Sequence, residues 1–408
     1  MRLSLFIFFI LFALSGSFGQ RVCGTLKYET SMFNKEFHSN QSNTQSRDTL
    51  PDEIISIPVV FHVLYNNAIQ NISDAQILSQ LQVLNEDYSR LNADASNTPN
   101  VFKPFAADVR IKFCIARADA LGRPTNGIIR KHTNNVSYNI DDAMKSSVAG
   151  GDDAWDCNSY LNIWVCNLAG HNLGYATQPG DPADKDGIVI QFDALGKIGN
   201  LQPDFNKGRT ATHEIGHWLG LKHIWGDSDC GNDGIYDTPQ QSSYNNNCPS
   251  FPHMSSCSPN SNGDMFMNFM DYTNDACMNL FTTGQKNKIR SLFALNGPRN
   301  SFLNSSACDS VTESAGSVPA NSTPAIPSEV SLSIYPNPID HDLNIVALNG
   351  YELKGKSISI YNLTGSLIYK STGLAAVNKI NLSFLTSGVY LLKIGNNAEK
   401  KVFKIIKL

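Results

Sequence analysis

The sequence carries no excess of positive charge. Its 408 residues include 32 Lys and Arg against 36 Asp and Glu, which gives a formal net charge of −4. Proteins that bind nucleic acid usually concentrate positive charge on one surface, so this balance argues against nucleic acid as a partner. Apolar residues make up 41% of the chain, an ordinary share for a globular protein, and the length is sufficient for two domains.

Long hydrophobic runs are absent except at the N-terminus. There Met1 and Arg2 precede the stretch LSLFIFFILFALSG, and small residues follow it. This order predicts a signal peptide over residues 1–19 with cleavage after Gly19, although an uncleaved anchor is the alternative. We therefore expect a secreted or cell-surface protein without stable membrane insertion.

The sequence also lacks the even number of cysteines that complete pairing would require. The chain has nine, and because cysteines of exported proteins are commonly paired, at least one is expected to lack an internal partner. Cys23 is the candidate, since it lies directly after the predicted cleavage point in the segment QRVCGT.

The spacing of apolar residues predicts an α+β domain over residues 51–300. Buried or half-buried strands are expected at 57–66, 109–116, 161–168 and 187–192. Residues 73–92 predict an amphipathic helix, in which Ser73 and Gln76 have the spacing of a capping box. Its apolar stripe consists of Ile77, Leu81, Leu84, Tyr88 and Leu91.

Regular periodicity ends before the C-terminal part of this domain. From Asp227 to Asn279 the sequence is rich in Asn, Ser, Pro, Gly and Cys, which predicts an irregular lobe held by cross-links. Residues 301–328 have few large apolar side chains and are expected to form a linker. Short alternating strands over 329–408 predict a small all-β sandwich.

The segment THEIGHWLGLKH has the spacing of a metal site. On a helix, His213 and His217 share one face with Glu214 beside them, and Gly220 allows the turn that returns His223 as a third ligand. Three protein ligands leave one position of a tetrahedral zinc open for water, whose proton Glu214 can accept during attack on a peptide bond. The alternative is a set of helix histidines with ordinary hydrogen bonds.

This motif, followed by MNFMDYT, resembles the metzincin clan of metallopeptidases. The resemblance implies that Met270 forms an apolar floor beneath the ligands and that Tyr272 helps to hold the transition-state oxyanion, whereas ordinary packing is the alternative. The segments DGIYDTPQQ and DYTNDACMNLFTTGQ narrow the resemblance to the pappalysin family.

Membership of that family implies two disulfides and calcium in the irregular lobe. The implied pairs are Cys230 with Cys257 and Cys248 with Cys277. The implied calcium ligands are Asp233 and Thr238, with Asp237 as a further candidate, and a turn without metal is the alternative. We assign no partners to Cys114, Cys157, Cys166 and Cys308.

The family resemblance also explains Cys23. Pappalysins carry an inhibitory motif of the form Arg-x-Cys-Gly-Thr, matched here from Arg21 to Thr25. Cys23, in a pro-segment of residues 20–50, is thus expected to bind the zinc and keep the enzyme latent, whereas a free or intermolecularly bonded cysteine is the alternative. Cleavage at Ser46–Arg47, in a polar segment, would release it.

Two features concern specificity and export. Some relatives select Arg after the scissile bond with an acidic residue where this chain has Ala276, although Asp275 is adjacent. The C-terminal strands resemble sorting domains of the type IX secretion machinery, although a sandwich of this size can also bind carbohydrate or protein. The sequence thus predicts a secreted zinc endopeptidase acting on proteins or peptides, and the alternative is an adhesion module with a structural metal site.

Overall fold

The computed structural model describes two compact units, Met1–Glu313 and Ser314–Leu408. Within the first unit the described residues are 21–25, 52–257 and 262–308. Within the second they are 332–335, 339, 341–347, 353, 356–362, 366–372, 377–395 and 400–407. The predicted signal peptide, the Ser46–Arg47 cleavage site and most of the predicted linker lie outside these residues.

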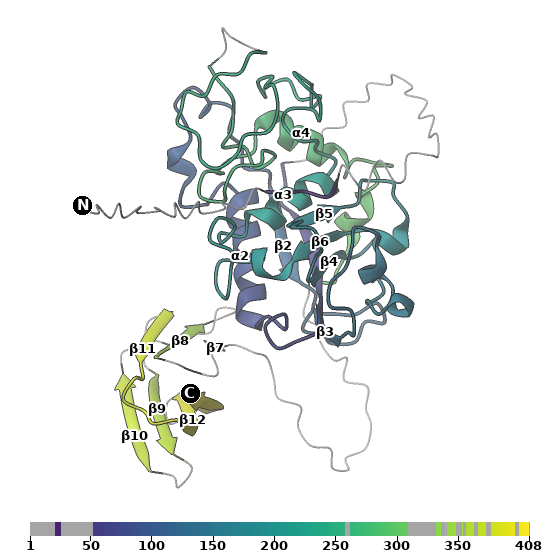
Figure 1. Ribbon diagram of the computed structural model, residues 1–408. Coiled ribbons are helices and arrows are strands. Elements are labelled where there is room, and N and C mark those ends of the chain that lie inside the picture. The colour runs from purple at the N-terminus through teal and green to yellow at the C-terminus, as the bar shows by residue number, and fades with distance from the viewer. Residues whose placement is uncertain are drawn as a thin grey trace, which may run out of the picture. The chain divides into compact units, whose positions relative to one another are not determined.

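A six-stranded sheet forms the centre of the first unit (Figure 1). Its order is β2-β1-β4-β6-β5, and β3 pairs with β1 beyond the end of β2. All pairings are parallel except that of β5 with β6. β1 is buried along nearly its whole length, which explains its continuous apolar sequence. The strands are β1 (Ile55–Tyr65), β2 (Ile111–Ile115), β3 (Ile128–His132), β4 (Leu161–Cys166), β5 (Gly174–Ala176) and β6 (Ile188–Gln191).

The helices α2 (Asp74–Tyr88) and α3 (Arg209–Trp218) pack against each other and against the sheet. The Ser73 hydroxyl caps α2 by accepting the N–H of Gln76 at 3.2 Å. The predicted capping box is only half formed, because the Gln76 side chain donates to the carbonyls of Phe192 and Leu195 instead. The predicted apolar stripe is one residue too long, since α2 ends at Tyr88 and Leu91 is 74% exposed.

The irregular lobe contains no helix or strand among its described residues between 227 and 279. Disulfides join Cys230 to Cys257 and Cys248 to Cys277, the two pairs that the family resemblance implies. The lobe leads into the helix α4 (Thr283–Ser291), where Thr282 and Gln285 form a complete capping box. The described part of the lobe is thus cross-linked by two disulfides instead of being held by a sheet.

A third disulfide, Cys114–Cys308, was not predicted from the sequence. It joins β2 to the segment after the short 3-10 helix η6 (Asn300–Asn304), whose Phe302 is 2% exposed and packs in the main core. The predicted linker of residues 301–328 therefore starts too early, because the folded unit continues to Cys308. Cys23, Cys157 and Cys166 are free cysteines.

The second unit consists of two antiparallel sheets with their own core. One sheet has the order β10-β9-β12-β13 and the other β11-β8-β7. Apolar side chains from both sheets share one core, among them Ile345 of β8 and Ile360 of β9, as expected for a small β-sandwich. The strands are β7 (Leu332–Tyr335), β8 (Asp342–Ala347), β9 (Ser357–Asn362), β10 (Leu367–Thr372), β11 (Val377–Asn381), β12 (Gly388–Gly395) and β13 (Lys400–Lys407).

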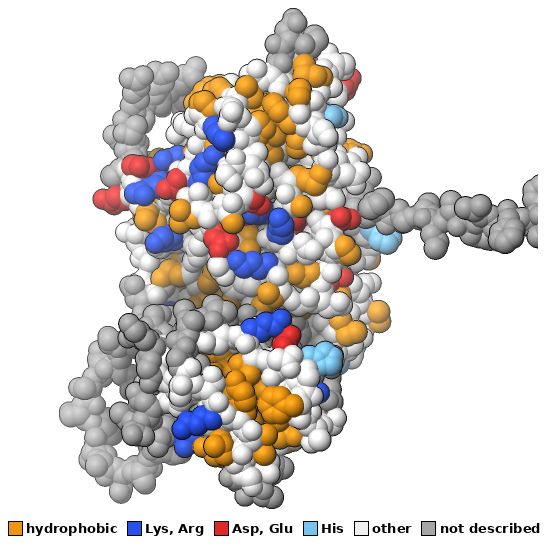
Figure 2. Space-filling model, turned by 90° about the vertical axis from the view of Figure 1, so that its left-hand side faces the viewer, with side chains coloured by type: hydrophobic (Ala, Val, Ile, Leu, Met, Phe, Trp, Pro, Cys, Tyr) orange, Lys and Arg blue, Asp and Glu red, His pale blue; other side chains and the backbone are white. Residues whose placement is uncertain are grey.

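The surface carries charges of both signs. On the face drawn in Figure 2, the basic and acidic side chains are interspersed, in keeping with the small net charge. Among the helices that the structure describes, none has the length and apolar character needed to cross a membrane.

Candidate active site

Three histidines converge at the C-terminal half of α3. His213 and His217 lie one turn apart on this helix, and Gly220, with φ of 75°, lets the chain turn so that His223 returns to them. The Nε2 atom of His217 lies 3.2 Å from Nε2 of His213 and 3.1 Å from Nε2 of His223. All three residues are at most 1% exposed. The predicted ligands thus form one buried cluster.

The opposite ring nitrogens fix the orientation of these histidines. Each Nδ1 lies within hydrogen-bond distance of an acceptor: the Phe269 carbonyl for His213, the Leu221 carbonyl for His217 and the Asp227 carboxylate for His223. Burial, as the largest cause, lowers the pKa of His213 and of His217, so these rings are neutral. With Nδ1 donating, the Nε2 lone pairs face one another, an arrangement that a cation between them would stabilise.

Asp227 is a site residue that the sequence analysis missed. Its carboxylate orients His223 and adds negative charge behind the ring. The signal was its spacing, because Asp227 follows His223 by four residues in HIWGD. Without the fold, however, an aspartate at this distance could equally well face solvent.

Cys23 reaches the histidines from the predicted pro-segment. Its Sγ atom and one nitrogen of each histidine all lie within 4.8 Å of one another. Backbone hydrogen bonds hold this segment along β5, from Gly24 N–H to the Gly174 carbonyl at 2.8 Å and from Leu173 N–H to the Val22 carbonyl at 2.9 Å. Burial and the charge of Glu214 raise the pKa of Cys23, so a thiolate here requires a nearby cation.

Glu214 is buried beside the cluster and is held by the same segment. The Thr25 hydroxyl donates to its Oε2 at 3.2 Å, and Cys23 Sγ lies 3.4 Å from that oxygen. Burial raises the pKa of Glu214 to about 7, although the contacts with Cys23 and Thr25 oppose the shift. The carboxylate is thus in contact with the side chains of Cys23 and Thr25.

Met270 packs against α3, and Tyr272 lies beside His223. A Cβ atom on Gly216 of α3 would come within 2.4 Å of the Met270 sulfur, so this glycine makes room for Met270 under the helix. The Tyr272 ring lies 4.9 Å from that of His223 between centroids, and its hydroxyl is 3.5 Å from the Cys23 carbonyl oxygen. Tyr272 thus faces a peptide carbonyl beside the three histidines.

Arg21 occupies a buried polar pocket. Its Nη2 contacts Asp275 Oδ1 at 2.5 Å, and its Nε donates to the Thr273 carbonyl at 3.2 Å. Arg21 is 2% exposed and Asp275 is fully buried. The acidic residue of this pocket is therefore Asp275, one position before Ala276.

The calcium candidates are divided between two places. Thr238 Oγ1 lies 2.9 Å and 3.0 Å from the two carboxylate oxygens of Asp233. Burial raises the pKa of Asp233 to about 6. Asp237 instead accepts hydrogen bonds from the Thr282 hydroxyl and the Gly284 N–H at the start of α4. The structure thus brings two of the three candidates together.

The chain is similar to known protein families and to curated proteins. A family model described as "Pregnancy-associated plasma protein-A" matches residues 142–294, and one described as "Secretion system C-terminal sorting domain" matches residues 333–408. An extracellular metalloprotease of Arthroderma otae is 30% identical over 302 residues, which are 71% of this chain and 96% of the relative.

Two solved structures have a higher sequence identity to this chain. Mature mirolysin of Tannerella forsythia, in complex with a cleaved peptide, is 52% identical with a TM-score of 0.61, over 62% of this chain and 97% of that chain. A promirolysin variant of the same organism is 51% identical with a TM-score of 0.61, over 62% of this chain and 85% of that chain.

The fold and the site define a metallopeptidase. More narrowly, the chain belongs to the pappalysin family and is a secreted or cell-surface metalloprotease with a metzincin fold. Its C-terminal unit is a sorting domain of the type IX secretion system, which makes that machinery its export partner.

Proposed function

We propose that the protein is a zinc-dependent endopeptidase made as a latent precursor. The observation that supports this most directly is the cluster of three imidazole nitrogens and one thiol, from His213, His217, His223 and Cys23. Nitrogen and sulfur donors in this number suit tetrahedral zinc. When Cys23 leaves, three protein ligands remain, as a catalytic zinc site requires.

The chain's own residues supply the acid–base chemistry. Bound zinc would activate a water molecule and polarise the peptide carbonyl. Glu214, with a pKa of about 7, is suited to accept the proton of that water and to pass it to the departing amine. Tyr272 would donate to the oxyanion, since its hydroxyl already faces a peptide carbonyl in the latent chain.

The Arg21 pocket supports a preference for Arg after the scissile bond. A buried carboxylate aligned with a guanidinium is a selective receptor for arginine, because replacing the cation leaves Oδ1 of Asp275 without its charged partner. In the precursor, Arg21 would occupy the pocket and Cys23 the metal, so one segment would block two subsites. The similarity to promirolysin agrees with such a precursor.

Asp233 and Thr238 remain the basis for a calcium site in the irregular lobe. Their oxygens lie together in a partly buried turn, and oxygen donors of this kind suit calcium. Asp237 is not proposed as a ligand, because both of its oxygens hold the start of α4.

Zinc analysis combined with Glu214→Gln tests the enzyme against the adhesion module. The variant should retain zinc yet lose activity at least about 100-fold, because a general base is removed without a metal ligand. Glu53→Gln, at an exposed position, is the matched control and should behave as wild type. A zinc-loaded Glu214→Gln protein with full activity would refute the mechanism, whereas a wild type that holds stoichiometric zinc and stays inactive after residues 20–46 are removed would favour a structural metal site.

A further inference from the structure

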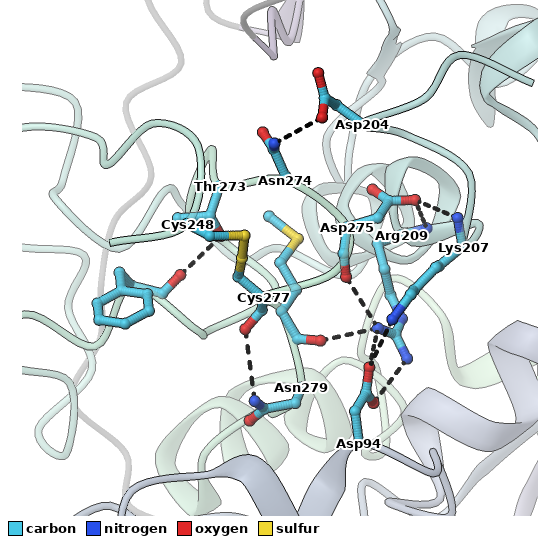
Figure 3. The surroundings of a disulfide bond; sticks show 12 residues. Asp94, Asp204, Lys207, Arg209, Cys248, Thr273, Asn274, Asp275, Cys277 and Asn279 are labelled. Atoms are coloured by element: carbon cyan, nitrogen blue, oxygen red, sulfur yellow. Dashed lines mark hydrogen bonds and ion pairs between the residues drawn. A yellow bond between two sulfur atoms is a disulfide. The ribbon is translucent and has the colours of Figure 1, made fainter. Parts of the chain in front are cut away.

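Arg209, the first residue of α3, connects this helix to the pocket that holds Arg21. It is 5% exposed. Its backbone N–H donates to Asp275 Oδ2 at 3.1 Å. Its Nη1 donates to the Asp275 carbonyl at 3.3 Å and to the Met278 carbonyl at 2.8 Å, and Figure 3 shows these contacts around one loop. Arg209 therefore contacts the pocket residue at both its side chain and its backbone.

Asp94 holds the same guanidinium on the other side. Its two carboxylate oxygens lie 3.0 Å from Nη1 and 3.1 Å from Nη2 of Arg209, a bidentate pair. Burial raises the pKa of Asp94, but the hydrogen bond and charge of Arg209 outweigh it and lower the pKa. Asp94 is therefore ionised at neutral pH and, together with Asp87, whose Oδ2 lies 2.8 Å from Nε of Arg209, fixes the plane of the guanidinium.

The rest of the loop is anchored by groups that do not face the guanidinium. The Cys248–Cys277 disulfide fixes its end, and Asp204 accepts the N–H of Asp275 at 3.0 Å and a side-chain N–H of Asn274 at 3.0 Å. These contacts hold the loop in place, whereas Arg209 binds the carbonyls of Asp275 and Met278. Arg209 thus holds the carbonyl of Asp275, while Asp204 holds its N–H.

We propose that Arg209 and Asp94 are positioning residues for the recognition of an arginine side chain by Asp275. This rests on the proposed preference for Arg after the scissile bond. Oδ2 of Asp275 accepts the N–H groups of Lys207 and Arg209, which leaves Oδ1 directed at the guanidinium. A small rotation of the Asp275 peptide would misalign Oδ1, and paired charged groups are sensitive to such displacement.

The test uses enzyme freed of its pro-segment and three peptides that differ only after the scissile bond, with Arg, its uncharged isostere citrulline, or Leu. Arg209→Lys and Asp94→Asn should each lower the ratio of kcat/KM for Arg over citrulline about tenfold. The kcat/KM for the Leu peptide should change little, because Leu does not need the Asp275 charge.

Arg299→Lys is the matched control. Arg299 is likewise a buried arginine with a bidentate carboxylate partner, Asp186, but it stacks on Trp218 away from the Asp275 loop. This variant should lower the melting temperature without changing the Arg-to-citrulline ratio.

The outcomes separate the two proposals. If Arg209→Lys and Asp94→Asn lower only the melting temperature and keep the wild-type ratio, the positioning role is refuted while the Arg preference stands. If wild type itself does not distinguish Arg from citrulline, the Arg preference fails and the positioning role fails with it. Should Arg209→Lys not fold, Asp94→Asn decides, because it keeps Arg209 and its backbone hydrogen bond.

Discussion

The Cys23 thiol is one of several contacts by which residues 21–25 would block the site, so its removal isolates the contribution of the proposed metal ligand. Cys23→Ala should become active sooner than wild type, because the metal would lose its thiolate cap. The measurement is peptidase activity over a time course, with the N-terminus of the protein determined in parallel. Cys157→Ala, at a free cysteine outside the site, is the control.

An unchanged lag in Cys23→Ala would show that the cysteine is not the switch. The Thr25 hydroxyl, which donates to Glu214, and the Arg21 contact with Asp275 would then account for latency. Thr25→Val and Arg21→Ala would distinguish these two contacts, since each removes one of them and leaves Cys23 in place.

Asp271 gives a prediction about pH. Its carboxylate accepts hydrogen bonds from Gln241, Asn245 and the Tyr272 N–H, yet burial raises its pKa to about 6 from an ordinary 3.8. The folded protein then binds this proton more tightly than the unfolded chain does. Stability from this group is therefore present at low pH and is lost by about 3 kcal/mol as the pH rises from about 4 to 6.

Asp271→Asn tests whether this group destabilises the protein as the pH rises, because asparagine does not titrate. The free energy of unfolding, measured with urea, should shift in favour of the variant relative to wild type as the pH rises through this window. The comparison cancels other titrating groups, which both proteins share. Parallel pH profiles would contradict the raised pKa.

Whether a site residue could be predicted depends on how far apart in the sequence it and its partners lie. His213, Glu214 and His217 could be predicted because helical geometry alone brings them together. Asp275 and Arg209 could not, since they are 66 residues apart and meet only through tertiary packing. The sequence shows the ligands on one helix, but it does not show which distant loop completes the pocket.

Among the elements, the irregular lobe should depend on calcium more than the sheet does. Its described residues form no helix or strand, and removal of a bound cation would leave the Asp233 carboxylate and the Thr238 hydroxyl without a shared partner. Calcium removal with EGTA should lower the melting temperature and the activity while zinc, measured separately, is retained.

Two neighbouring aspartates provide the control for this prediction. Asp233→Asn should abolish the stabilising effect of added calcium. Asp237→Asn should weaken the start of α4, where its oxygens accept two hydrogen bonds, but should keep the calcium response. An equal calcium response in wild type and Asp233→Asn would contradict a site at this turn.

The predicted elements were most accurate where burial alone decides them. The apolar run of β1 predicted its strand because both faces of a parallel sheet are covered. The end of α2 was placed too late, since Leu91 continues the helical period although the chain turns away after Tyr88. Gln76 likewise has capping-box spacing, but two distant carbonyls compete for its side chain.

For the whole molecule, a disulfide that the sequence does not predict extends the described part of the first unit to Cys308. Cys114 and Cys308 are separated by 194 residues, and pairing over such a distance follows from the fold rather than from local spacing. Low apolar content near residue 305 predicted a linker there, whereas the disulfide and the buried Phe302 extend the first unit to Cys308.

This boundary predicts where the catalytic unit can be cut. A chain ending after Cys308 should retain the peptidase activity and melting temperature of the enzyme without its second unit. A chain ending after residue 300 would lose the disulfide, worth about 2–4 kcal/mol, and the burial of Phe302, worth about 3–5 kcal/mol. Because the net stability of a domain is commonly only about 5–15 kcal/mol, the shorter chain should melt far lower or fail to fold.

Melting curves of the two truncated proteins, under oxidising and reducing conditions, check this prediction. Cys308→Ser in the longer chain is the control, since it removes the disulfide and keeps Phe302 and η6. Its melting temperature should lie between those of the two truncated chains, because only one of the two contributions is lost. Equal melting temperatures for the chains ending at 300 and 308 would instead place the end of the catalytic unit before η6, as composition alone suggested.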